Sequence, residues 1–173
     1  LNLKTGEGRD IFCKLVKEAD VIVEGFRPGV MQRLGLGYEA LQAVNPRVVY
    51  CAISGFGQDG PDALKSGHDL NYMGIAGALQ LFGTPGTGPI VPGLSIADVG
   101  GGSLMAAFGI LTALAARDRT GKGQFVDISM TDGLVSWLCY HAADYLFAGV
   151  EPRGGVQRFL GGAPCYNVYR CAD

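Results

Sequence analysis

Two short apolar runs, each followed by a glycine-rich turn, constrain the fold of this chain most. Residues 20–24 and 47–54 have the length and composition of buried strands, and residues 8–19 before them show helical periodicity. Strands that alternate with helices are typical of a parallel α/β sheet, in which ligands bind beyond the carboxyl ends of the strands. The turns 25–29 and 55–61 follow those ends directly. We therefore expect an α/β fold with a ligand site at these turns.

The rest of the chain continues the alternation. Further helices are expected over residues 30–34, 38–44, 68–81, 98–117 and 131–148, with a strand over 124–129 and an irregular loop over 83–93. Residues 1–4 look like the end of a strand, and residues 165–170 alternate like one. We divide the chain into a large-domain portion over 1–148, a linker over 149–164 and the start of a smaller second domain over 165–173. Because both ends look interrupted, we expect a piece of a longer protein.

Composition narrows the classes of function. The net charge is −2 and the basic residues form no stripe, which argues against a nucleic-acid partner. The five cysteines form no CxxC pair, so we assign no zinc, redox or other metal site and favour a reducing compartment. The apolar run 104–116 is shorter than a bilayer span, so we expect a core helix and no membrane partner. With no signal peptide, we expect a cytoplasmic protein, or a peroxisomal or mitochondrial one in a eukaryote.

One histidine and one aspartate are the best candidates for chemistry. His68 follows Gly67 where a helix is expected to begin, and Asp98 precedes the glycines 100–102. The simpler interpretations are an ordinary surface or core histidine and a helix N-cap. However, a neutral imidazole is a competent base, and the glycines would let a substrate approach backbone N–H groups that stabilise an oxyanion. We therefore expect His68 and Asp98 to act on one carbon from opposite faces, and we treat His141 as structural.

Three cations lie near the expected strand ends. Arg27 and Arg33 flank the turn after the first clear strand, and Lys4 lies at the end of the opening segment. Exposure to solvent is the usual fate of such residues, and phosphate binding by guanidinium is the functional alternative. The sequence has no GxGxxG fingerprint, Walker loop or nucleophile elbow. The sequence therefore lacks the usual motifs for dinucleotide binding, nucleoside triphosphate binding and serine hydrolase activity.

Five stretches of the chain, taken together, resemble the family III CoA-transferases. They are VIVEGFRPGVMQRLGLG (21–37), SGFGQDGP (54–61), GHDLNY (67–72), DVGGG (98–102) and GKGQFVDISMTDG (121–133). The resemblance runs over essentially the whole chain. Within the family it is strongest to the α-methylacyl-CoA racemase branch, because His68 stands where transferases often carry tyrosine or another residue.

The resemblance implies the Rossmann-like parallel sheet of that family's large domain, acyl-CoA thioesters as substrates, and a homodimer of interlocked subunits. It implies that His68 and Asp98 are the two bases, and no cofactor beyond the coenzyme A moiety of the substrate. A glutamate that the racemases pair with the aspartate lies outside the chain, as does an arginine near the start of the domain. The coenzyme A contacts that it carries over are Leu1, Asn2, Leu3, Lys4, Gly25, Phe26, Arg27, Arg33, Gly67, Asp69, Leu70, Asn71 and Tyr72.

The favoured hypothesis is therefore a racemase that removes and returns the α-proton of 2-methylacyl-CoA thioesters through an enolate. One alternative is a CoA-transferase in which Asp98 is the covalent nucleophile. Another is a coenzyme A-binding piece without activity of its own. Exchange of the α-proton with solvent would favour the first, and a mass shift on Asp98 would favour the second.

Overall fold

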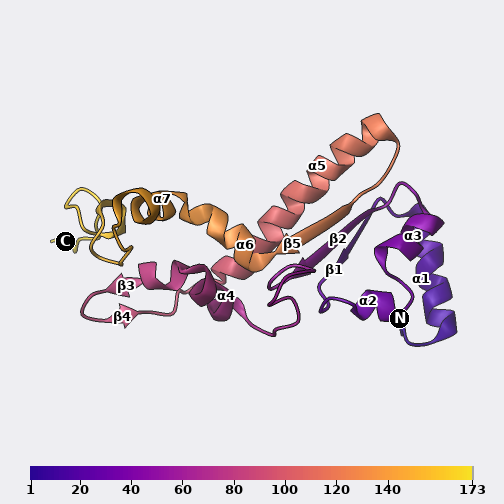
Figure 1. Ribbon diagram of the computed structural model, residues 1–173, viewed down its shortest axis with the longest axis horizontal. Helices are drawn as coiled ribbons and strands as arrows, with labels where there is room; N and C mark the ends of the chain where they lie inside the picture. The colour runs from indigo at the N-terminus through magenta and orange to yellow at the C-terminus, as the bar shows by residue number, and fades with distance from the viewer. Residues whose placement is uncertain (173) are drawn as a thin grey trace.

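The computed structural model describes residues 1–172, and its elements follow the expected alternation of helices and strands (Figure 1). The first half contains α1 (Gly6–Glu18), β1 (Val21–Glu24), α2 (Val30–Arg33), α3 (Tyr38–Val44), β2 (Val49–Ser54), α4 (Asp69–Ala76), the 3-10 turn η1 (Ala78–Leu81), β3 (Gly83–Thr84) and β4 (Gly88–Pro89). The second half contains the π-helix η2 (Ala97–Leu104), α5 (Met105–Thr120), β5 (Phe125–Ser129), α6 (Met130–Val135), the 3-10 turn η3 (Ser136–Leu138), α7 (Cys139–Ala148) and the 3-10 turn η4 (Arg158–Leu160).

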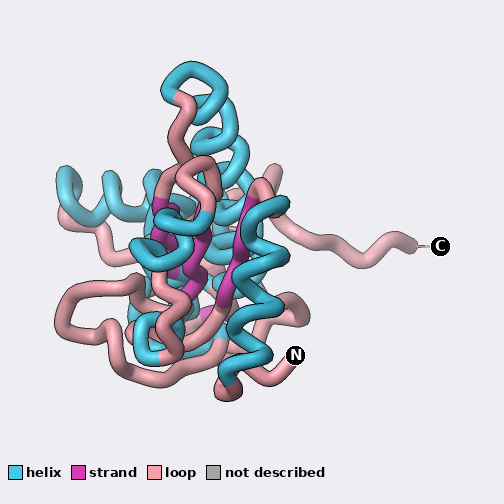
Figure 2. The backbone as a smooth tube through the Cα atoms, turned by 90° about the vertical axis from the view of Figure 1, so that its right-hand side faces the viewer, coloured by secondary structure: helices cyan, strands magenta, loops and turns pink. Residues whose placement is uncertain are grey.

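A three-stranded parallel sheet with the order β1-β2-β5 organises the fold. Val21 of β1 pairs with Val49 of β2, and Ser54 at the end of β2 pairs with Ser129 at the end of β5. Because all three strands run in the same direction, their carboxyl ends lie at one edge of the sheet. Figure 2 shows the strands enclosed by helices. The expected parallel α/β fold is therefore confirmed.

The first face of the sheet is covered by α1 and α3. Tyr50 and Ala52, two residues apart on β2, share a buried cluster with Val16 of α1 and Leu41 of α3. Val16, Leu41 and Tyr50 are each no more than 1% exposed. The period of two along β2 thus assigns these side chains to one face and leaves the residues between them for the other.

The opposite face is covered by η2 and α5. Gly102 of η2 lies against the side chain of Ile53, and a Cβ atom on Gly109 would come within 2.8 Å of Val126 Cγ1. Ala113, one turn further along α5, is buried. The small residues along η2 and α5 therefore permit close packing, and the surface that approaches them is the sheet.

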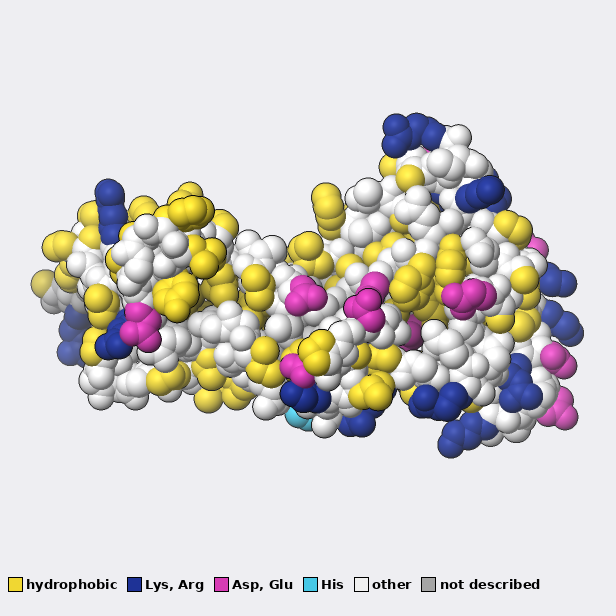
Figure 3. Space-filling model, in the orientation of Figure 1, with side chains coloured by type: hydrophobic (Ala, Val, Ile, Leu, Met, Phe, Trp, Pro, Cys, Tyr) yellow, Lys and Arg dark blue, Asp and Glu magenta, His cyan; other side chains and the backbone are white. Residues whose placement is uncertain are grey.

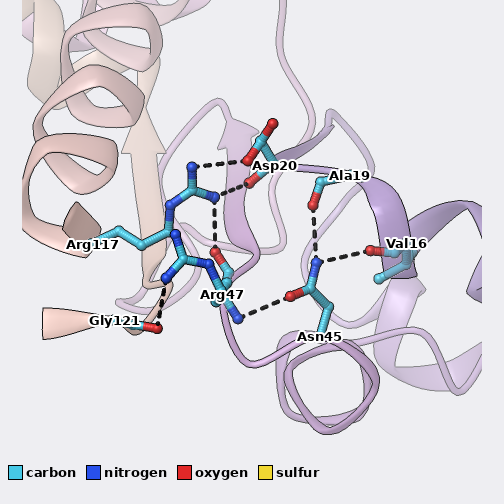
Figure 4. A network of polar contacts seen from close by, with 7 residues as sticks. All are labelled: Val16, Ala19, Asp20, Asn45, Arg47, Arg117 and Gly121. Atoms are coloured by element: carbon cyan, nitrogen blue, oxygen red, sulfur yellow. Dashed lines mark hydrogen bonds and ion pairs between the residues drawn. The ribbon is translucent and has the colours of Figure 1, made fainter.

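The amino edge of the sheet is fastened by a polar network around the end of α5 (Figure 4). The Arg117 guanidinium pairs with Asp20 Oδ1 at 2.9 Å and donates to the carbonyl oxygen of Arg47 at 3.2 Å. Asn45 donates from Nδ2 to the carbonyl oxygen of Val16, which joins the loop before β2 to α1. These bonds lie at the edge where the strands begin, and the carboxyl edge is left available for a ligand.

Several expected elements differ in detail from the structure. The helix expected over 68–81 is interrupted at Gly77, which has a φ of 83°, and the helix expected over 131–148 is interrupted by η3. Residues 1–4 form a turn that leads into α1, where the Thr5 hydroxyl caps the helix by accepting from the Gly8 N–H. Within the described part of the chain, residues 165–170 form no strand. A strand needs a neighbouring strand to satisfy its backbone, and none lies beside this segment.

The longest helical run, Ala97–Thr120, has 24 residues and is apolar enough by length and composition to cross a membrane. The expectation of a run too short to do so was therefore wrong, because η2 extends α5 in the amino-terminal direction. The packed core helix of a water-soluble domain meets the same criterion. Here Ala113 and Arg117 are buried, whereas Phe108 and Leu111 on the outer side are 68% and 66% exposed.

The carboxyl-terminal part, from α7 onwards, extends away from the sheet (Figure 1). None of the residues of α7 is buried, and Phe147 is 90% exposed. Hydrophobic side chains accordingly gather on the surface of this end of the molecule (Figure 3). The division into a large-domain portion, a linker and the start of a second domain remains a prediction.

Candidate active site

A pocket of about 280 Å³ lies at the carboxyl edge of the sheet. Each strand contributes to its wall at or just beyond the end of the strand: residues 25–28 after β1, residues 53–55 around the end of β2, and Met130 after β5. The loop before α4 closes the pocket with Ala63 and residues 65–68, and Tyr72 of α4 completes the lining. The pocket therefore includes most of the first glycine-rich turn and Gly55 of the second, and a ligand site there remains a prediction.

His68 lies where this loop becomes α4. It is the N-cap of the helix, its backbone is extended, and its N–H donates to Asn71 Oδ1 at 2.9 Å. The residue is exposed and lines the pocket. The expected position of His68 at the start of a helix is confirmed, and the helix end directs positive electrostatic potential toward groups bound beside it.

Tyr72 fixes the loop that carries His68. Its ring lies edge-on to Phe56, with centroids 5.3 Å apart, and a Cβ atom on Gly67 would approach the ring to 2.7 Å. A Cβ atom on Gly55 would clash with the same ring. The two glycines are therefore required so that both turns can close around one buried aromatic side chain.

Asp98 lies in the first turn of η2, with Ile96 as the N-cap, so the interpretation of Asp98 as the N-cap was wrong. The Asp98 N–H donates to Asp69 Oδ1 at 3.0 Å, which connects the start of η2 to the start of α4. A π-helix is rare and is found frequently at functional sites. Asp98 is partly buried and does not line the 280 Å³ pocket; it is linked to the pocket through Asp69, the neighbour of the lining residue His68.

Electrostatics couples the groups of this region. Burial, and then the negative charge of Asp69, raise the pKa of Asp98, whereas the charge of His68 lowers it. Burial and the charge of Asp98 raise the pKa of Tyr72, whereas Arg27 lowers it. A carboxyl group with a raised pKa holds its proton more tightly than a free aspartate, which suits a group that must both accept and return a proton.

The glycines 100–102 do not have the role that was expected of them. All three are buried, and a Cβ atom on Gly101 would clash with the carbonyl oxygen of Met130. A Cβ atom on Gly133 would clash in turn with the carbonyl oxygen of Gly101. Gly101 therefore lets η2 and α6 approach backbone to backbone, and the three buried glycines are not open to a substrate that seeks N–H donors.

The structure brings together only some of the candidate contacts for coenzyme A. Gly25, Phe26, Arg27, Gly67 and Tyr72 line the pocket. The remaining candidates lie outside its lining: Leu1, Asn2, Leu3, Lys4, Arg33, Asp69, Leu70 and Asn71. Of these, Leu3 packs against the core cluster under α1, Arg33 lies beside Gly29 in the turn after β1, and Asp69 and Asn71 make the helix-terminal bonds given above.

Lys65 and Ser54 are two of the lining residues that were not among the candidates from the sequence. Lys65 lies in the loop before His68 and forms an ion pair with Asp62 at 2.6 Å. Ser54, at the end of β2, is 8% exposed, and its hydroxyl has no hydrogen-bond partner among the described residues. The signal for both was their position at a strand end or in the loop that follows it. Within residues 1–172, no group of three or more His, Cys, Asp or Glu side chains is arranged to hold a metal ion.

Comparisons with known proteins agree on one family. The sequence model of "CoA-transferase family III" matches residues 1–173. The chain is 45% identical over 173 residues to alpha-methylacyl-CoA racemase of Homo sapiens, an alignment that covers 100% of this chain and 45% of that protein. It is 41% identical over 174 residues to acetyl-CoA:oxalate CoA-transferase of Acetobacter aceti, which covers 100% of this chain and 44% of that protein.

Solved structures agree with the sequence comparisons. The crystal structure of a CAIB/BAIF family protein from Brucella suis superimposes with a TM-score of 0.85 at 39% identity. The superposition covers 90% of this chain and 42% of that one. The chain thus spans less than half the length of each of these three relatives.

Proposed function

The chain belongs to CoA-transferase family III, and on that premise we propose that its protein racemises 2-methylacyl-CoA thioesters. In this reaction a base breaks the bond between the α-carbon and its hydrogen, and the electron pair moves into the thioester carbonyl to form an enolate. A second group then delivers a proton to the opposite face. The chemistry needs two proton-transfer groups, one on each face of the α-carbon.

The observation that carries this proposal is the pairing of His68 and Asp98 through adjacent helix ends. His68 is the N-cap of α4, and Asp98 is hydrogen bonded to Asp69, the next residue of the same helix. In the proposed reaction His68 acts on one face and Asp98 on the other. The raised pKa of Asp98 supports a role in which it is protonated during part of each cycle.

The pocket supplies groups that suit the coenzyme A moiety. Arg27 and Lys65 both line it, and both are donors that bind phosphate. Phe26, which is 47% exposed beside them, provides apolar surface. We assign the anionic part of the thioester to this side of the pocket, with the reactive carbon directed toward His68 and Asp98. As a partner we propose a second copy of the chain in an interlocked homodimer, and as a compartment the cytoplasm.

A CoA-transferase is the second candidate, and one observation favours it. The identity to the oxalate CoA-transferase is 41%, close to the 45% found for the human racemase. In that reaction the Asp98 carboxylate attacks the thioester carbonyl, the bond to the coenzyme A sulfur breaks, and an acyl anhydride forms on Asp98.

One experiment separates the two candidates. The protein that contains this chain is incubated in deuterium oxide with an enantiopure 2-methylacyl-CoA. The optical purity and mass of the recovered thioester are then measured, together with the mass of the peptide that contains Asp98. The racemase proposal predicts loss of optical purity together with one deuterium at the α-carbon and an unmodified Asp98. A retained α-proton with an acyl group or coenzyme A on Asp98 would show that the protein is a transferase.

A further inference from the structure

The side chain of Asp69 joins two helix ends that are distant in the sequence. Asp69 is the first residue of α4, immediately after His68. Its Oδ1 accepts a hydrogen bond of 3.0 Å from the N–H of Asp98, which is 29 residues further along the chain. The resemblance assigned Asp69 to coenzyme A, but in the structure its carboxylate is directed to the backbone of η2.

The bond meets a specific need of the Asp98 backbone. N–H groups in the first turn of a helix have no acceptor within the helix. The Asp69 carboxylate provides the acceptor and places a negative charge at the positive end of the helix dipole. A hydrogen bond to an ionised acceptor is stronger than a neutral one, so this contact restrains the start of η2 firmly.

We propose that Asp69 is a positioning residue that holds Asp98 at a fixed place relative to His68. The inference rests on the proposed function, because racemisation by two bases requires the two proton-transfer groups to be held in a fixed relative position. His68 is joined to Asp69 by a peptide bond, and the backbone N–H of Asp98 is hydrogen bonded to the Asp69 side chain. A movement of one helix end therefore carries both groups with it.

The charge of Asp69 has a second consequence for Asp98. The two charged groups that act on Asp98 both come from the start of α4: Asp69 raises its pKa and His68 lowers it. The other helix packed on η2 is α6, which approaches through Gly101, Met130 and Gly133. The α6 carboxylate, Asp132, acts on Asp127 in a different pocket.

Two substitutions separate the hydrogen bond from the charge. Asp69→Asn keeps an oxygen acceptor and removes the charge, whereas Asp69→Ala removes both. Asn71→Ala is the matched control, since it deletes the other side-chain bond at the start of α4, to the His68 N–H, and leaves the bond to Asp98 intact. All three are made in the protein that contains this chain.

The first readout is hydrogen exchange of the Asp98 amide, which does not depend on activity. We expect Asp69→Ala to accelerate it about tenfold or more, the size expected for loss of one charge-assisted hydrogen bond, whereas Asp69→Asn and Asn71→Ala leave it within about threefold. Unchanged exchange in Asp69→Ala would overturn the positioning role.

The second readout is the pH profile of α-proton exchange. We expect Asp69→Ala to lower kcat about tenfold or more with little change in KM. Asp69→Asn should retain most of kcat and move the acidic limb, where Asp98 takes up its proton, to lower pH. Equal losses of kcat in both variants without movement of that limb would refute the inference. If the unsubstituted protein shows no α-proton exchange, the proposed racemisation fails, and amide exchange still decides the role of Asp69.

Discussion

The Tyr72 hydroxyl donates a hydrogen bond of 2.6 Å to the carbonyl oxygen of Gly67, the residue that precedes His68. Tyr72 lies one turn into α4, so the bond closes the chain back on itself around the start of the helix. Burial and the charge of Asp98 raise the pKa of Tyr72, which keeps the hydroxyl protonated and able to donate. The direction in which His68 enters the pocket is therefore set by a buried ring one turn away.

Tyr72→Phe should lower both stability and turnover. The variant keeps the ring that packs on Phe56 and removes the bond to Gly67. One neutral hydrogen bond is worth about 1 kcal/mol, so we expect unfolding in urea to become easier by about that amount and kcat to fall several-fold. Tyr140→Phe, at a position 72% exposed, is the control and should change neither quantity. Wild-type turnover in Tyr72→Phe would mean that the loop places His68 without this bond.

Arg27→Gln should weaken substrate binding more than it slows the reaction. Arg27 lines the pocket at the carboxyl end of β1, and loss of one charged hydrogen bond costs about 1.5–3 kcal/mol. We expect KM for the acyl-CoA to rise at least tenfold with kcat nearly unchanged. Arg33, which the resemblance also assigns to coenzyme A, lies outside the lining of this pocket, so Arg33→Gln should raise KM less than Arg27→Gln. Arg119→Gln, at the exposed end of α5, controls for net charge. A fall in kcat at constant KM would contradict the binding role.

Two glycine-to-alanine substitutions in helices should have opposite effects. Gly101→Ala places a methyl group against the carbonyl oxygen of Met130, and forced overpacking typically costs about 1–3 kcal/mol. Gly74→Ala in α4 meets nothing within 4 Å and should stabilise by about 0.5–1 kcal/mol through helix propensity. The midpoints of urea unfolding of the two variants and the wild type measure both changes in stability. If Gly101→Ala is as stable as the wild type, η2 and α6 do not depend on backbone contact.

Glu24→Gln should reduce the pH dependence of stability. Burial raises the pKa of Glu24, although the Phe26 N–H and the Tyr50 hydroxyl lower it in part. The folded state therefore binds this proton more tightly than the unfolded state. That contribution to stability is fully present below the ordinary glutamate pKa and is lost as pH rises through the raised one.

The glutamine variant has no such proton and retains an oxygen that can accept from the Phe26 N–H. We expect the free energy of unfolding of the variant, relative to wild type, to increase as pH rises from below the ordinary glutamate pKa to neutrality. The measurement is urea unfolding at a series of pH values. A difference that stays constant across that range would show that Glu24 does not titrate with folding.

The sequence predicted the three strands of the parallel sheet because they are apolar runs bounded by turns, such as the run that ends at Ser54 before Gly55, whereas the strands expected at 1–4 and 165–170 are absent from the described residues. It also placed His68, which follows Gly67, correctly at the start of a helix. Neither result required knowledge of tertiary contacts, because the pattern of each segment is local.

Other features depend on contacts between distant segments. The glycines after Asp98 indicate that another group can approach this backbone closely, but the sequence does not show whether that group is a substrate or α6. The bond from Asp98 to Asp69 and the π-helical geometry of η2 likewise arise from tertiary packing. The break at Gly77 was the one such feature with a local signal, since glycine readily adopts a positive φ.

The most direct test of a reaction with two bases is α-proton exchange by His68→Ala and Asp98→Asn, measured separately on each enantiomer of a 2-methylacyl-CoA in deuterium oxide. Loss of either base should slow racemisation by about 10²–10⁴-fold. Each variant should still exchange the α-proton of one enantiomer without inverting it, and the two variants should retain opposite enantiomers, because the surviving base serves one face. His141→Ala should racemise like the wild type. If both variants lose exchange from both enantiomers equally, or if either racemises normally, His68 and Asp98 are not a pair of bases on opposite faces.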